Sequence, residues 1–123
     1  MIDARVLEQY SCSQIVYRAA TGSDWIRQNG KVRKQAFYRR QNHDPNGLSC
    51  APTQADCTLH LDRPTHGTIT LHVGRVRDLG LDVIPTDPTH ANIVGVPYRE
   101  GDDKARATFL ASKLAEIARS ISN

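Results

Sequence analysis

The stretch that decides the fold is HGTITLHVGRVRDLGLDVIPTDPTHANIVGVP, residues 66–97. Its first part alternates, because Ile69, Leu71 and Val73 fall on one side of an extended chain and polar residues fall on the other. A period of two with β-branched residues is typical of a half-buried strand. The pattern therefore predicts a strand over residues 68–73.

The rest of this stretch contains two more extended runs. A short helical turn is expected around residues 75–78, followed by a second strand at residues 83–84 that ends at Pro85. Residues 90–96 predict a third strand, after turn chemistry that includes Asp and Pro. Strands joined by turns this short predict an antiparallel sheet with this stretch at its centre.

Outside this stretch the pattern is more local. Strands are expected at residues 14–19, 31–40 and 48–50, and short helical segments at residues 23–30 and 53–61. Near the end of the chain, Leu110, Leu114 and Ile117 follow helical spacing, which continues to Ile121. This stripe predicts an amphipathic helix over residues 104–121 that packs across one face of the sheet.

The fold expected from these patterns is a single α+β domain over residues 1–123. It has a small, mainly antiparallel sheet of about five strands with the C-terminal helix packed on one face. The side chains expected to form the common core are Leu71, Val73, Leu79, Leu81, Ile93, Leu110, Leu114 and Ile117.

Length and composition limit the class of protein. A chain of 123 residues buries a real core without help from disulfides or metals. No apolar run approaches the roughly 18 residues that a membrane helix needs. The first residues lack the apolar segment of a secretory signal, and three cysteines are an odd number for a disulfide framework. We therefore expect a cytoplasmic protein without a membrane partner.

Positive charge is concentrated in the first third of the chain. Residues 1–43 hold eight Lys or Arg against three acids, a charge of +5, whereas the remaining residues hold eight against ten, a charge of −2. The basic residues surround an aromatic pair, a composition suited to tracking a phosphate backbone and stacking a base. The candidate ligand-binding residues here are Lys31, Arg33, Lys34 and Tyr38. The alternative is a solvated strand whose lysines protect a sheet edge.

Histidines and arginines lie on or beside several expected strands. Arg18, His66 and His90 are the candidate catalytic residues, because imidazole and guanidinium groups together suit proton transfer at a phosphate or ribose. Arg75 and Arg77 are further candidates for ligand binding. The alternative is that these arginines pair with nearby acids, namely Asp78, Asp82 or Asp87.

A metal site is considered at Cys50, Cys57, His60 and His66. Their spacing matches no common zinc module, and cysteine is among the most frequently buried residues. The sequence also lacks a Gly-rich phosphate loop. We therefore expect neither a metal nor a cofactor.

One resemblance covers less than half of the chain. The pair Tyr17-Arg18, a helix ended by Gly30, and a strand followed by Leu48-Ser49 occur in an order that resembles the opening of ADP-ribosyltransferase-like folds. In that family an Arg or His on the first strand and a Ser on a later strand hold the dinucleotide. The resemblance implies this role for Arg18 and Ser49.

The chain departs from that family at its late catalytic glutamate, which has no clear counterpart. Asn92 or Glu100 would have to take its place.

These observations leave three functions open. The first is a domain that binds, and in one version acts on, a phosphate-bearing ligand, either RNA or a nucleotide, through Arg and His residues. The second is a metal-free enzyme, either NAD-handling or a ribonuclease of the toxin-like kind. The third is a protein–protein adaptor that uses the sheet edge or the terminal helix, so the sequence leaves open whether the protein is an enzyme.

Overall fold

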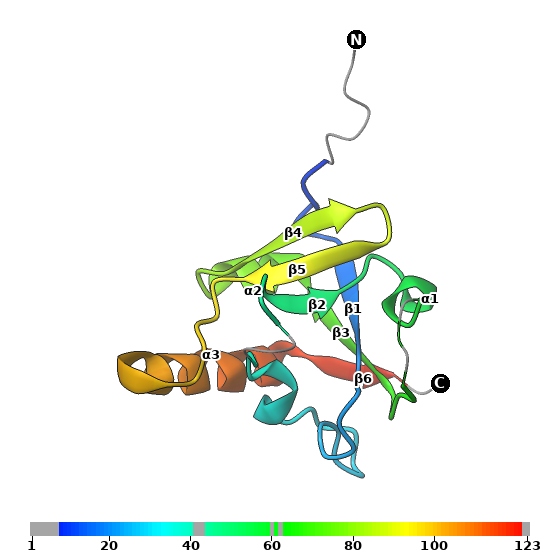
Figure 1. Ribbon diagram of the computed structural model, residues 1–123. Coiled ribbons are helices and arrows are strands. Elements are labelled where there is room, and N and C mark those ends of the chain that lie inside the picture. The colour runs from blue at the N-terminus through cyan, green and yellow to red at the C-terminus, as the bar shows by residue number, and fades with distance from the viewer. Residues whose placement is uncertain (1–7, 41–43, 60, 62, 122–123) are drawn as a thin grey trace.

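The computed structural model of the chain describes residues 8–40, 44–59, 61 and 63–121. Within them the chain is α+β, with two three-stranded antiparallel sheets and a C-terminal helix (Figure 1). The expected class, antiparallel pairing and terminal helix are confirmed, and the strands are divided between two sheets.

The first sheet has β3 (Thr68–His72) at its centre. It pairs on one side with β1 (Ile15–Ala19) and on the other with β6 (Arg119–Ile121). Ile69 and Leu71 are buried in the core as expected, whereas Thr68, expected on the polar side, is buried as well.

The second sheet has β5 (His90–Val94) at its centre, between β2 (Leu48–Cys50) and β4 (Asp82–Asp87). Residues 66–97 therefore supply the central strand of both sheets. The expected stop at Pro85 is wrong, because β4 continues through it. A proline is tolerated there because β4 is an edge strand, and the pairing register shifts between Pro85 and Asp87.

The two sheets meet at Tyr17 and Ala51. Their backbone groups exchange two hydrogen bonds, and both N–O distances are 2.8 Å. This isolated bridge lies between the end of β2 and the middle of β1. It places Arg18, the next residue on β1, beside the second sheet.

Short helices connect the strands. They are η1 (Lys34–Phe37), α1 (Gln54–Cys57), α2 (Val73–Asp78) and η2 (Gly101–Asp103), and the long helix α3 (Lys104–Ile117) follows. The Thr53 hydroxyl caps α1 by accepting a hydrogen bond from the Asp56 backbone N–H. Helix α3 packs against η1, so the terminal helix supports the segment that precedes β2 (Figure 1).

Two local expectations are wrong. Residues 31–40 do not form a strand, because consecutive Ala36 and Phe37 are both buried and a strand would point them to opposite faces. A 3-10 turn buries both. Residues 23–30 form no helix but a turn-rich loop, in which the Arg33 N–H donates to the Trp25 carbonyl.

The C-terminal helix is shorter than expected. It ends at Ile117, because Ala118 has extended backbone angles, with φ −78° and ψ 154°. The next three residues form β6 and pair with β3. The apolar spacing that continues to Ile121 thus belongs partly to a strand, which local periodicity alone does not separate from a helix end.

The core lies between the sheets and α3. Six of the eight expected core residues are buried: Leu71, Val73, Leu81, Ile93, Leu110 and Leu114. Leu79 and Ile117 are partly buried and pack against this cluster. In the described part of the chain, no helix combines the length and the apolar character that a membrane crossing requires.

Candidate functional site

A cavity of about 300 Å³ lies where the two sheets meet. Its wall combines three arginines, an indole ring and a hydrogen-bonded Ser–His pair. They are Arg18, Arg40, Arg63, Trp25, Ser49 and His90. We call this the Arg18 cavity.

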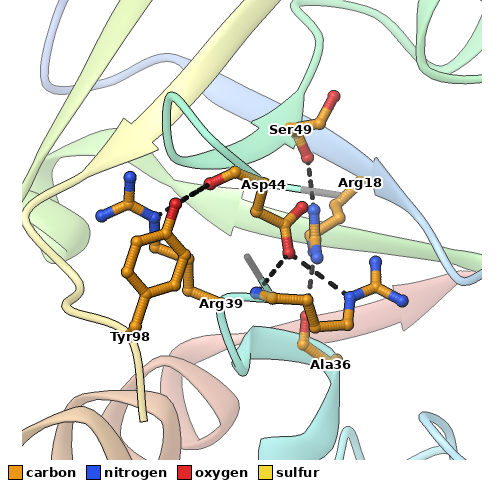
Figure 2. A network of polar contacts seen from close by, with 7 residues as sticks. Arg18, Ala36, Arg39, Asp44, Ser49 and Tyr98 are labelled. Carbon is orange, nitrogen blue, oxygen red and sulfur yellow. Dashed lines mark hydrogen bonds and ion pairs between the residues drawn. The ribbon is translucent and has the colours of Figure 1, made fainter. Parts of the chain in front are cut away.

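Arg18 is the most constrained cation in this wall. Only 4% of the residue is exposed, and its guanidinium lies over the Trp25 ring, 5.1 Å from the ring centroid. Its Nε donates to the Ala36 carbonyl at 3.0 Å and its Nη1 to the Ser49 carbonyl at 2.7 Å (Figure 2). These two carbonyls fix the guanidinium plane at the junction of β1, η1 and β2.

The charge of Arg18 has no directly bonded counter-ion. Within the described residues, its hydrogen bonds end on carbonyls, it forms no ion pair, and Nη2 has no hydrogen-bond partner. Burial lowers the pKa of Arg18, and the nearby Asp44 carboxylate opposes that effect. Because an arginine pKa begins far above neutrality, the group stays charged. The cavity therefore holds a positive charge in a partly dry setting.

Asp44 is the buried carboxylate of this region. It is 4% exposed, and its Oδ2 accepts hydrogen bonds from the Arg40 backbone N–H at 2.9 Å and from Arg40 Nε at 3.4 Å. Asp44 thus holds Arg40 at the cavity wall and offsets part of the local positive charge.

Arg39 has a structural role next to this cluster. Its guanidinium donates to three backbone carbonyls, those of Asp44, Pro45 and Val96. It also stacks on Tyr98, 4.1 Å from the ring centroid, and Figure 2 shows the two side chains close together. These contacts tie the segment before β2 to the segment after β5.

A chain of short polar contacts runs through His90. Ser49 Oγ lies 2.7 Å from His90 Nε2, and His90 Nδ1 lies 2.6 Å from Thr86 Oγ1. The Thr86 hydroxyl also donates to the His90 carbonyl at 3.3 Å. Strand pairing explains the approach, because Ser49 lies opposite Asn92 and His90 is two residues away on the same face of β5.

The structure brings together two of the three candidate catalytic residues. Arg18 and His90 both line the Arg18 cavity, whereas the His66 side chain is exposed and lies outside its lining. The backbone N–H of His66 donates to the Ala20 carbonyl, so its position is set by the approach to β3.

The candidate ligand-binding residues do not converge on the Arg18 cavity. Arg75 is exposed on α2, and Arg77 pairs with Asp82 at 2.8 Å, which is the expected alternative of an ion pair with a nearby acid. Lys31 lines a different cavity beside Arg119.

The rest of the basic segment is also dispersed. Arg33 is half-buried just before η1, and Lys34 is exposed on it. Tyr38 lines a separate groove, where the Arg99 guanidinium stacks 4.0 Å from its ring centroid. The expected strand would have placed Arg33 on one face and Lys34 with Tyr38 on the other, and a 3-10 turn forms instead.

Sequence reasoning missed Trp25 and three polar residues of the site. Arg40 was only one of several basic residues, Arg63 lies after a segment without a motif, and Thr86 belonged to an expected turn. Their roles depend on which strands pair, and one sequence carries no direct signal for that pairing. The resemblance did single out Ser49, which the structure places beside Arg18.

Asn92 and Glu100, the two residues that would replace the catalytic glutamate of the ADP-ribosyltransferase-like folds, lie apart from one another. Asn92 is buried on β5, directly opposite Ser49 in the strand pairing. Glu100 is exposed in the loop before η2 and lines the groove that contains Tyr38.

The cysteine sulfurs are free, and Cys50 is buried in the cavity wall. Burial raises the pKa of the Cys50 thiol to about 12, and Arg18 partly opposes this effect. The thiol is therefore neutral at physiological pH and a poor nucleophile. Among the described residues no cluster of His, Cys, Asp or Glu could hold a metal ion, and His60 lies outside them.

Comparisons with protein-family models, curated proteins and solved structures find no match to this chain.

Proposed function

We propose that the chain binds a phosphate-bearing ligand, a nucleotide, in the Arg18 cavity. The observation that carries this proposal is the buried Arg18 guanidinium, which is held by two carbonyls and has no directly bonded carboxylate. A phosphate group would supply the missing negative charge. Arg40 and Arg63 line the same cavity, and Asp44 offsets the charge of Arg40.

The guanidinium group suits an oxyanion such as phosphate. Its planar fork of donors matches phosphate oxygens, and charge-assisted hydrogen bonds gain strength in a partly desolvated cavity. Arg18 Nε and Nη1 are held by the protein, so the group is oriented before a ligand arrives. Such pre-organisation lowers the entropy cost of binding.

The size of the cavity favours a nucleotide over an RNA strand. A volume of about 300 Å³ is at the lower end of small-molecule sites. Trp25 is only 7% exposed and has the Arg18 and Arg40 guanidinium groups over its ring, so the ring supports these two cations. An RNA strand needs a continuous basic track, whereas Lys31 and Arg75 lie outside this cavity.

A second candidate is an enzyme that handles NAD. The observation in its favour is the hydrogen bond between Arg18 and the Ser49 carbonyl, because the resemblance implies that these two residues hold a dinucleotide. Asn92, opposite Ser49, is an amide where that family has a carboxylate. Binding of NAD without cleavage of its glycosidic bond is the outcome that this difference favours.

The test is calorimetric titration of the protein with ADP, NAD and a short single-stranded RNA at two salt concentrations. We expect ADP or NAD to bind at a single site and the RNA to bind more weakly, with a shallow dependence on salt. A steep salt dependence with RNA preferred would point to an extended basic surface. Absence of binding by all three ligands would overturn the proposal.

A further inference from the structure

The distances between Ser49, His90 and Thr86 fit one arrangement of three hydrogens. The Thr86 hydroxyl carries one hydrogen, and a carbonyl only accepts, so the 3.3 Å contact to the His90 carbonyl uses that hydrogen. The 2.6 Å contact to His90 Nδ1 is then a hydrogen bond when the hydrogen lies on Nδ1. This arrangement satisfies all three contacts at once.

The consequence falls on Ser49. A neutral imidazole with its hydrogen on Nδ1 has a lone pair on Nε2, so Nε2 accepts the hydrogen bond from the Ser49 hydroxyl across 2.7 Å. This is the geometry of a serine next to a general base that a third group orients. Ser49 is exposed and lines the Arg18 cavity together with His90.

Arg18 lies next to the same serine. It donates to the Ser49 carbonyl at 2.7 Å, and Figure 2 shows that carbonyl directed at the guanidinium. The guanidinium therefore binds the backbone of the same residue that carries the serine hydroxyl. Negative charge that develops on a bound phosphoryl group would meet it in the cavity wall, and preorganised charge of this kind stabilises a transition state.

We propose that Ser49 is a nucleophile that attacks a phosphoester or phosphoanhydride held in the Arg18 cavity. His90 acts as the general base, and Thr86 positions the imidazole. This inference rests on the proposed function for its substrate class. It goes further by assigning a covalent reaction to Ser49.

The reaction balances without an added oxidant, reductant or metal. Ser49 Oγ forms a bond to phosphorus while the bond from phosphorus to the leaving oxygen breaks, and the serine proton passes through His90 Nε2 to that oxygen. Water then attacks the phosphoserine and gives a proton to His90. The bond between Oγ and phosphorus breaks, and Ser49 recovers the proton.

The first test uses an alkyl fluorophosphonate as the probe, with intact-protein and peptide mass spectrometry. Ser49 Oγ would displace fluoride and form one stable adduct on Ser49. Ser49→Ala should form none, and His90→Ala should react at least about 100-fold more slowly, because general-base catalysis contributes on that order. Ser11→Ala is the matched control, since it removes an exposed serine outside the cavity.

Variants of Thr86 test whether its hydroxyl positions the His90 imidazole or only supports the structure. Thr86→Val keeps the shape and removes the hydroxyl, and it should slow labelling by about 10-fold. Thr86→Ser restores a hydroxyl and should restore the rate. Circular dichroism and the melting temperature verify that each variant is folded. A Thr86→Val rate equal to that of the wild type would contradict the positioning role.

The substrate class has its own readout. Release of nitrophenolate from bis(4-nitrophenyl) phosphate should occur with the wild type and disappear in Ser49→Ala. An adduct at another residue, equal labelling of wild type and His90→Ala, or no nitrophenolate release overturns the inference. Nucleotide titration of Ser49→Ala separates the two proposals, because loss of the reaction with binding retained removes only the nucleophile.

Discussion

Arg18 and Arg77 are both arginines of the kind that the sequence marks for phosphate binding, yet their surroundings differ. Arg18 is 4% exposed and donates to two carbonyls, whereas the Arg77 side chain is 24% exposed and pairs with Asp82 at 2.8 Å. Arg77 Nη1 also lies 3.2 Å from Cys12 Sγ. A carboxylate cancels charge, and carbonyls only orient it. The partners of a cation, more than its exposure, therefore decide whether its charge remains available to a ligand.

The two regions also differ in the contacts that support them. Residues of β1, β2, α1 and β5 line the Arg18 cavity. The Ala36 carbonyl of η1 accepts a hydrogen bond from Arg18, and η1 packs against α3. The Arg77 pair is local, because Arg77 and Asp82 are five residues apart. Changes in the core should therefore reach the Arg18 cavity and leave the Arg77 pair unaffected.

The largest expected effect on stability comes from a substitution in α3, the helix that packs against η1. Leu114 on α3 is fully buried, so Leu114→Ala should lower the free energy of unfolding by about 2–5 kcal/mol through lost burial and a residual cavity. Urea denaturation measures it, with exposed Glu116→Ala on the same helix as the control. A cost near zero would mean that the apolar stripe of α3 does not face this core.

Removal of Arg18 should have the next largest effect on stability. Arg18→Ala leaves the Ala36 and Ser49 carbonyls without their donors and the Trp25 ring without its cation. We expect a loss of about 2–4 kcal/mol in the free energy of unfolding. Unchanged stability in the same urea assay would show that these carbonyls find water instead and that the guanidinium is not held.

The free energy of unfolding should fall as the pH rises above 9, because the Cys50 thiol is buried. Its pKa is raised from 9.0 to about 12 in the folded chain. Between these values the unfolded chain loses the thiol proton and the folded chain keeps it, so stability falls as pH rises. The slope from this group is about 1.4 kcal/mol per pH unit. Cys50→Ala should remove that slope in urea denaturation from pH 9 to 10.5, and an unchanged slope would refute it.

The smallest expected effect on stability is that of removing Arg77. Arg77→Ala removes an exposed ion pair, which contributes little because water screens it. Its urea midpoint should match that of the wild type, and so should its affinity for ADP. A marked loss of ADP affinity in this variant would place the ligand on α2 and contradict the Arg18 cavity.

Much of the fold follows from the sequence because the signals are local. The alternation of Ile69, Leu71 and Val73 predicts β3, and the spacing of Leu110 and Leu114 predicts α3. Strand β2 spans the expected residues 48–50 and follows Gly47, whose φ of 128° only glycine adopts readily.

The errors have tertiary causes. Phe37 and Ala36 are buried together, which selects a 3-10 turn over a strand, and neither residue type signals this. The pairing of β6 with β3 begins directly after α3, and only the finished sheet supplies that partner. Local propensity is overridden where packing against a distant element decides the outcome.

The site likewise contains one residue that the sequence identifies and others that only the strand pairing brings together. Arg18 is identifiable because a charged residue inside an apolar strand needs a buried partner or a ligand. Ser49 and His90 meet only because β2 pairs with β5 in one register, and a shift of one residue would turn them to opposite faces. Thr86 reaches His90 because β4 pairs with β5. The sequence predicts only a turn at Thr86, so it does not indicate this contact.

The most direct test of the Arg18 cavity is calorimetric titration of ADP into the wild type, Arg18→Lys and Arg75→Lys. Lysine keeps the charge and loses the planar fork, so Arg18→Lys should bind ADP at least about 10-fold more weakly, a loss of about 1.4 kcal/mol. Arg75→Lys, an equal change at an exposed residue of α2, should bind like the wild type. Equal affinity for ADP in all three folded proteins would contradict the account.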